Sequence, residues 1–258
     1  MKIRVIIYSL CFAMLGLFVS CRCGEKEKSQ NTMAPVKTVL VEDSLGYDVE
    51  NKSSVFTTIS IESPLGLDEA SQKNFIIWLS TTLSCERSMD KDAVKSLARA
   101  YVSTGAANLK NAYTKLDNDL KKSPIQLWDV VNIKKVYDDD LYVTYIAERE
   151  YFGGEYGVQS ASIGYTFNRS DFDLAELIAP SDEQYYIDMV TEELGHTLVD
   201  DPENLRGLLF EDAVDKSGKV KLPAHGAYLI DDTLVFQYQE YEIVPGKPCV
   251  KIPMKKKQ

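Results

Sequence analysis

Three β-rich runs follow one another between residues 127 and 168, separated only by short polar or glycine-rich connections. The first two runs flank the turn Asp138-Asp139-Asp140, and the third follows the stretch YFGGEYG at residues 151–157. Strand-forming residues with such short connections are typical of antiparallel strands joined in sequence. These residues therefore predict a three-stranded meander, around which the rest of the chain has to fold.

The flanking residues predict a mixed architecture. SSVFTTISIES (53–63) alternates like a strand, whereas residues 67–85 and 89–105 carry apolar side chains at helical spacing, with Gly105 expected to interrupt the second helix. A further helix is expected over residues 181–195, and a hairpin turned at Asp231-Asp232 near the end. The predicted fold class is α+β, with an antiparallel sheet (meander plus C-terminal hairpin) packed against several helices.

The N-terminus has the features of an export signal. Lys2 and Arg4 precede an apolar run over residues 5–20, which is short for a membrane span but typical of a signal peptide. The run ends in FVSC, which resembles a lipobox with Cys21 as the lipidated residue. We therefore expect anchoring to a lipid bilayer through Cys21 and a place in the bacterial cell envelope, facing the periplasm or the cell surface. An ordinary signal peptide and an uncut membrane anchor are the alternatives.

The expected domain organisation follows from these segments. Residues 1–20 are predicted to be a lipoprotein signal peptide and residues 21–45 a flexible tether. Residues 46–125 are expected to form an N-terminal strand and helical part, and residues 126–258 a C-terminal module. Residues 46–258 are expected to form one compact unit.

Charge limits the classes of partner. The formal net charge is −10, and it becomes about −12 once Lys2 and Arg4 leave with the signal peptide. Nucleic acid is excluded as a partner because binding phosphates requires clustered lysine and arginine, which the chain lacks apart from Lys255 to Lys257. A basic partner would be attracted at long range.

The sequence contains no recognisable catalytic or metal-binding motif. GxSxG, HExxH and CxxC are absent, and there are two histidines. We therefore expect no enzyme activity, no cofactor and no metal, although a Cys85–His196 dyad stays open as an alternative. Cys85 and Cys249 are either a disulfide pair or two buried free thiols.

The glycines of YFGGEYG have a simple interpretation. A turn that needs positive φ explains them, and the Lys-Ser/Thr of a phosphate loop is missing. We therefore interpret the stretch as the second turn of the meander.

The C-terminal half resembles the family called domain of unknown function 3298. The resemblance is carried by Gly153-Gly154 between strands, by the Asp-Leu-x-x-Leu-Ile run at residues 173–178, and by YEIVP at residues 241–245. That family is similar to the extracellular domain of the anti-sigma factor RsiV, which binds lysozyme. Glu155-Tyr156 stand where the family commonly has Ala-His.

This resemblance implies a binding module. We expect a non-catalytic, lipid-anchored envelope module that recognises a basic protein such as lysozyme, or a cell-wall glycan fragment. The alternatives are an envelope hydrolase with an unrecognised site, using Cys85 or a Glu–Asp pair, and a structural envelope lipoprotein. The candidate ligand-binding residues are Tyr151, Gly153, Gly154, Glu155, Tyr156, Tyr241 and Glu242.

Overall fold

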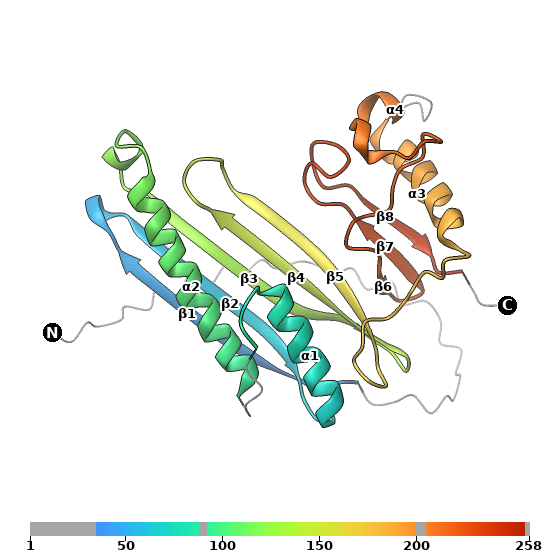
Figure 1. Cartoon of the computed structure of the whole chain (residues 1–258), viewed down its shortest axis with the longest axis horizontal. Helices are drawn as coiled ribbons and strands as arrows, with labels where there is room; N and C mark the ends of the chain where they lie inside the picture. Colours follow the sequence, from blue (N-terminus) through green and yellow to red (C-terminus); the bar gives the residue numbers. More distant parts are fainter. Residues whose placement is uncertain (1–34, 88–91, 200–204, 256–258) are drawn as a thin grey trace, which may run out of the picture. The chain divides into compact units, whose positions relative to one another are not determined.

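A five-stranded sheet dominates the computed structural model, which describes residues 35–87, 92–199 and 205–255 (Figure 1). The strands lie in the order β1-β2-β3-β4-β5, and all neighbours are antiparallel except β2 and β3. Their bounds are β1 Thr38–Asp48, β2 Ser54–Pro64, β3 Gln126–Asp138, β4 Tyr142–Phe152 and β5 Gln159–Asn168. The predicted meander is confirmed as β3-β4-β5.

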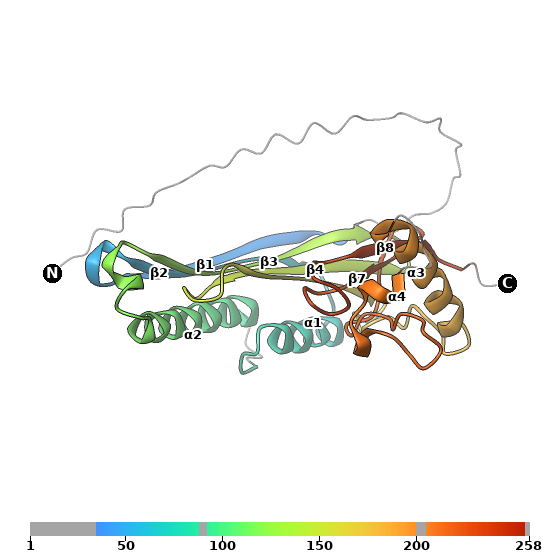
Figure 2. The same ribbon diagram turned by 90° about the horizontal axis from the view of Figure 1, so that it is seen from above.

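The parallel pairing of β2 with β3 follows from the helices between them. A parallel neighbour needs a long crossover connection, and α1 (Glu69–Thr82) and α2 (Ala93–Lys115) provide it. Both helices lie on the same side of the sheet, as Figure 2 shows. They bury alternate residues of the strands, so that Val55, Ile59 and Ile61 of β2 are almost completely inaccessible to solvent. The alternation predicted for this strand is therefore confirmed.

Helix α2 corrects one expectation, because it runs through Gly105 without interruption. A Cβ atom at residue 105 would lie 2.8 Å from both Cγ2 and Oγ1 of Thr57 on β2. The glycine therefore serves close packing of the helix on the sheet and does not break the helix.

The C-terminal part forms a second, smaller sheet. Its strands are β6 Tyr228–Ile230, β7 Thr233–Gln237 and β8 Cys249–Pro253, all antiparallel, with the predicted hairpin turn between β6 and β7. Helices α3 (Glu183–Leu198) and α4 (Leu205–Leu208) pack with this sheet around a core of their own. The α+β fold class is confirmed, and strand β8 is present in addition to the predicted strands.

The two sheets meet through side chains of β4 and β5. The Thr144 hydroxyl donates to the Leu229 carbonyl at 2.7 Å, and the Leu229 amide donates to the Thr166 hydroxyl at 2.9 Å. Gly164 lies directly beneath the ring of Tyr228, since a Cβ atom there would be 2.1 Å from Cγ of that ring. The small sheet is thus fitted closely onto one end of the large one.

The expected tether was wrong for residues 38–45, which belong to β1. The reason is that VLVEDSLGY pairs along its whole length with β2, from Thr38 opposite Pro64 to Asp48 opposite Ser54. Val41 is buried against the core. Residues 1–34, with the predicted signal peptide and Cys21, lie outside the described residues.

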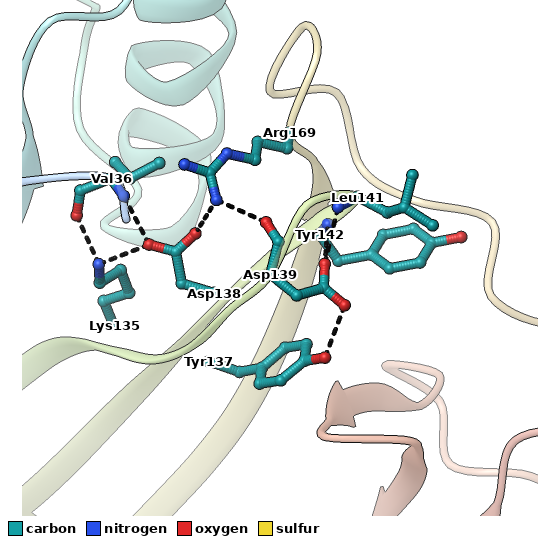
Figure 3. A network of polar contacts seen from close by, with 8 residues as sticks. All are labelled: Val36, Lys135, Tyr137, Asp138, Asp139, Leu141, Tyr142 and Arg169. Atoms are coloured by element: carbon teal, nitrogen blue, oxygen red, sulfur yellow. Dashed lines mark hydrogen bonds and ion pairs between the residues drawn. The ribbon is translucent and has the colours of Figure 1, made fainter. Parts of the chain in front are cut away.

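A network of polar contacts fixes the turn between β3 and β4 to the start of β1 (Figure 3). The Asp138 carboxylate accepts hydrogen bonds from the Val36 amide at 2.6 Å, from Lys135 Nζ at 2.8 Å and from Arg169 Nη1 at 2.6 Å. The side chains of Asp138 and Arg169 are only 8% and 7% exposed. This buried pair therefore fixes the segment that leads into β1.

Asp139 completes the same network. Its carboxylate accepts from the amides of Leu141 and Tyr142 at 2.8 and 2.6 Å and from the Tyr137 hydroxyl at 2.6 Å. Asp139 lies in the turn, as expected, whereas Asp138 is the last residue of β3, and the oxygens of both are engaged by protein donors.

Candidate functional site

A cleft of about 710 Å³ opens between the helical layer and strands β3 to β5. It extends from the end of α1 along α2, and its floor is formed by side chains of the sheet. The residues that define it are Cys85, Tyr101, Asn108, Asp129, Arg149 and Ile163. A neighbouring hollow of about 830 Å³ shares Thr82 and Ile163 with the cleft and is lined mainly by aromatic and aliphatic side chains.

Three polar side chains from three elements meet in the cleft. Arg149 of β4 donates to Asp129 of β3 through Nε at 2.8 Å and through Nη2 at 2.9 Å. The Tyr101 hydroxyl of α2 donates to the same carboxylate at 2.9 Å. Asp129 is 3% exposed, whereas the Arg149 side chain is 52% exposed. The cleft therefore contains a buried carboxylate with a half-exposed guanidinium at its surface.

The electrostatics of these three side chains hold Arg149 and Tyr101 in fixed protonation states at neutral pH. The hydrogen bonds that Arg149 donates to Asp129 raise the pKa of Arg149, and burial together with the Asp129 charge raises the pKa of Tyr101. The arginine therefore stays charged and the phenol stays protonated at neutral pH. Asp129 is an ion-pair partner and hydrogen-bond acceptor here, with its oxygens already engaged.

Cys85 lines the cleft as well, but its thiol is poorly suited to attack a substrate. Burial raises the pKa of the Cys85 thiol, while a nucleophilic cysteine needs a lowered pKa. Among the described residues that line the cleft there is no histidine. The Cys85–His196 dyad is therefore not brought together at this cleft.

The glycine-rich stretch forms the loop from β4 to β5, as predicted. A Cβ atom on Gly153 would lie 2.7 Å from the Tyr151 hydroxyl oxygen, and Gly154 has φ +99° with the Leu116 side chain 2.9 Å from the position of a Cβ. Glu155 and Tyr156 point outward, and Tyr156 is 84% exposed. The loop thus presents an acidic and an aromatic side chain on a tightly packed base.

The loop and the cleft are joined by Tyr151. Its ring lies under the Arg149 guanidinium, 5.5 Å from ring centroid to Cζ, which is within cation–π range. Tyr151 also lines a hollow of about 260 Å³ together with Leu116, Glu155 and Tyr156. The predicted residues of this loop therefore line a hollow of their own, which is connected to Arg149 through Tyr151.

Tyr241 and Glu242 occupy the connection between β7 and β8. Glu242 braces that connection, since its carboxylate accepts from the amides of Ala224 and Gln239, both at 2.7 Å. Tyr241 is 67% exposed. In the part of the chain that the structure describes, no hydrogen bond or ring contact links either residue to the loop of residues 153–157, so the predicted residues form two separate groups.

Tyr101, Asp129 and Arg149 were not among the residues predicted from the sequence. One signal was available, because Asp129 occupies an inward position of an alternating strand between Leu127 and Val131. A carboxylate in such a position requires a partner when it is buried. Tyr101 fell within an apolar helical stripe and carried no such signal.

Two further predictions concern cysteines and metals. Cys85 and Cys249 are both free, so the disulfide alternative was wrong and the alternative of two free thiols is confirmed, except that Cys85 is half-buried and Cys249 exposed where both were expected to be buried. The described residues contain no group of three or more His, Cys, Asp or Glu that could hold a metal ion. Within the same residues, every helix is too short or too polar to cross a membrane.

No protein-family model and no curated protein matches the chain, so the comparisons rest on solved structures. A crystal structure of a member of the DUF3298 family from Bacteroides fragilis matches with a TM-score of 0.59 and 16% identity, over 84% of this chain and 92% of that one. A DUF3298 family protein from Pseudomonas aeruginosa matches with a TM-score of 0.51 and 13% identity, over 85% and 91% of the two chains. The chain therefore shares the fold of solved members of the domain of unknown function 3298 family.

Proposed function

We propose that the chain is a lipid-anchored, non-catalytic binding module of the bacterial envelope, and that its ligand is a basic protein such as lysozyme. The observation that carries the proposal is the pairing within the cleft. Its ionisable groups neutralise one another, which favours a preformed recess for binding over a site for turnover. The exposed Glu155 and Tyr156 line a separate small hollow, and Tyr151 connects that hollow to Arg149 of the cleft.

Charge supports a basic ligand. A net charge of −10 attracts a cationic protein during encounter, and the aromatic and acidic side chains of the small hollow suit lysine and arginine head groups. The likeness to RsiV noted in the sequence points in the same direction. The half-exposed Arg149 does not oppose this, because its charge is balanced by Asp129.

The binding proposal is tested by calorimetric titration of the full-length protein in detergent with lysozyme, at low and at physiological salt. We expect saturable binding that persists at physiological salt and weakens at least about tenfold in the double variant Glu155→Ala/Tyr156→Ala. The matched control is Tyr185→Ala/Glu192→Ala on α3, which removes the same residue types from another surface. Loss of binding at modest salt, or equal weakening in both variants, would overturn the proposal.

The anchor is tested separately by metabolic labelling with a radioactive fatty acid. We expect label on the wild-type chain and none on Cys21→Ser, while the control Cys23→Ser keeps the label. A chain that remains labelled without Cys21 would contradict the predicted lipobox.

The hydrolase alternative is tested by Cys85→Ala. Because the Cys85 thiol is protonated and half-buried, we expect lysozyme binding to be unchanged. Turnover of a cell-wall substrate by the wild type that disappears in Cys85→Ala would instead identify an enzyme.

A further inference from the structure

The face of the five-stranded sheet opposite α1 and α2 is only partly covered. The small sheet packs against its β4 and β5 end, through the contacts of Thr144, Gly164 and Thr166 already described. Figure 2 shows no described helix or strand over β1 and β2 on that side. We call the outward side chains of β1 to β4 in this region the open face.

An aromatic row crosses the open face. Phe56 of β2 is paired in register with Trp128 of β3, and Trp128 with Phe152 of β4. The Trp128 and Phe152 ring centroids are 4.8 Å apart at an angle of 43°. All three side chains are half-buried, and Gly46 of β1 extends the row beside Phe56 without a side chain. The row therefore forms a shallow apolar platform.

A polar hollow of about 460 Å³ adjoins the aromatic row on the same face. Its outward side chains come from three adjacent strands and are Glu42, Ser44, Thr58, Ser60 and Asn132. Within the described residues, the side chains of Thr58, Ser60 and Asn132 make no hydrogen bond to the protein. They are thus available as donors and acceptors for a ligand.

The aromatic row and the polar hollow are close enough for one extended ligand to contact both. Side chains on one face of a strand recur every second residue, or roughly 6.6 Å, so Trp128 and Asn132 are roughly 13 Å apart along β3. Both point to the same side of the sheet. A ligand that contacts both must be extended, with an apolar face for the rings and hydrogen-bonding groups for the hollow.

We propose that the open face binds a neutral, β-linked oligosaccharide. The C–H groups of a pyranose ring pack on aromatic rings, and its hydroxyl groups pair with hydroxyl, amide and carboxylate side chains. The Asn132 amide, which donates and accepts, matches an acetamido substituent. A β-linked chain is flat and extended, as the platform is.

Charge on the open face disfavours an anionic chain. Glu42, Glu148 and Glu150 face this side, and the Lys134 ammonium is paired with Glu148 at 3.4 Å. An anionic polymer would be repelled. A stable protein interface requires a larger continuous apolar area than one row of rings with hydroxyl groups beside it. This inference does not rest on the lysozyme proposal, because the two sites lie on opposite faces of the sheet.

The test uses tryptophan fluorescence of the full-length protein in detergent, titrated with a tetramer of β-1,4-linked N-acetylglucosamine. The chain has two tryptophans, and Trp78 is buried in the core with 7% exposure, so a ligand on the open face changes the emission of Trp128. We expect a saturable change that survives in Trp78→Phe and disappears in Trp128→Leu.

Calorimetry with the same tetramer provides the affinity. We expect Trp128→Leu to weaken binding about tenfold and Asn132→Ala by several fold, while Tyr165→Leu, a half-buried aromatic on the helix-covered face, leaves it unchanged. Circular dichroism establishes whether each variant is folded. If Trp128→Leu is unfolded, Asn132→Ala still tests the inference.

Several results would overturn the inference. These are absence of saturable binding at millimolar tetramer, equal binding of an α-linked glucose tetramer, tighter binding of polygalacturonate, or an unchanged affinity in Asn132→Ala. If Trp128→Leu weakens binding of lysozyme in place of the tetramer, the open face is a protein interface. If the protein binds lysozyme but not the tetramer, this inference is wrong while the proposed function stands.

Discussion

Strand β3 carries an aspartate near each end, and the two have opposite environments. Asp129 pairs with Arg149 and accepts from Tyr101, while Asp138 pairs with Arg169 beside the Tyr137–Asp139 hydrogen bond. Both carboxylates are buried. The Arg169 side chain is 7% exposed, however, whereas the Arg149 side chain is 52% exposed.

This difference in exposure distinguishes a polar cluster that stabilises the fold from one that remains accessible to a ligand. A fully buried ion pair is stable only when additional hydrogen bonds satisfy its remaining atoms, and the contacts from Lys135 and the Val36 amide do so around Asp138. A half-exposed guanidinium keeps one side toward solvent. The cluster around Asp138 and Arg169 fixes the start of β1 and the β3–β4 turn. The cluster around Asp129 and Arg149 can contact a ligand without unfolding the sheet.

The largest effect is expected from Arg169→Leu. The change leaves the Asp138 carboxylate buried with only part of its partners, so the free energy of unfolding should fall by about 3 kcal/mol. Urea denaturation followed by circular dichroism measures it. The double variant Asp138→Leu/Arg169→Leu should recover part of the loss, because it removes the stranded charge. A double variant less stable than Arg169→Leu would show that the pair acts through packing alone.

Arg149→Leu should have a smaller effect, about 1 kcal/mol on the free energy of unfolding. Asp129 keeps the Tyr101 hydroxyl as a donor, and an exposed guanidinium is already well hydrated. The difference between wild type and this variant should also shrink in high salt, whereas that for Arg169→Leu should not. Equal losses for the two arginines would remove the distinction between a structural and an accessible pair.

The sequence predicted this sheet better than its polar clusters. The meander, the strand over β2 and the first helix follow from local periodicity, which is decided by neighbouring residues alone. The parallel pairing of β2 with β3 and the inclusion of residues 38–45 in β1 depend on partners far along the chain. Gly105 was misread for the same reason, since its role is set by Thr57 on another element.

The candidate site shows the same limit. The loop of Gly153 to Gly157 could be predicted because positive φ is a local demand of a turn. The trio of Tyr101, Asp129 and Arg149 could not, because α2, β3 and β4 have to be packed before these side chains meet. The inward position of Asp129 was the one local sign that a partner existed.

The tyrosines offer a finer comparison of the two clusters. Tyr101→Phe and Tyr137→Phe each remove one hydrogen bond to a carboxylate, of 2.9 and 2.6 Å respectively. Each change should lower the free energy of unfolding by about 1 kcal/mol, measured again by urea denaturation. Since the phenol in the cleft is the one near a ligand, only Tyr101→Phe should alter lysozyme affinity. A change of affinity in Tyr137→Phe would mean that the turn cluster also shapes the site.

Alkaline pH gives the smallest expected effect. The difference in free energy of unfolding between wild type and Tyr101→Phe should become smaller as the pH rises. Burial, and then the Asp129 charge, raise the pKa of Tyr101 above its ordinary value of 10.0. A raised pKa means that the folded protein holds this proton more tightly than the unfolded chain does. The stabilisation is therefore complete below pH 10 and is lost as the pH rises beyond it.

Tyr101→Phe lacks this term, so its free energy of unfolding should fall less steeply above pH 10 than that of the wild type. Urea denaturation of both proteins at a series of alkaline pH values measures the two slopes. The Tyr137→Phe variant gives the matched comparison, because burial and the hydrogen bond to Asp139 likewise raise the pKa of Tyr137. Parallel curves for wild type and Tyr101→Phe would mean that this phenol ionises equally easily in both states. The cleft would then be wetter than its geometry implies, and Asp129 would be open to a ligand as well as Arg149.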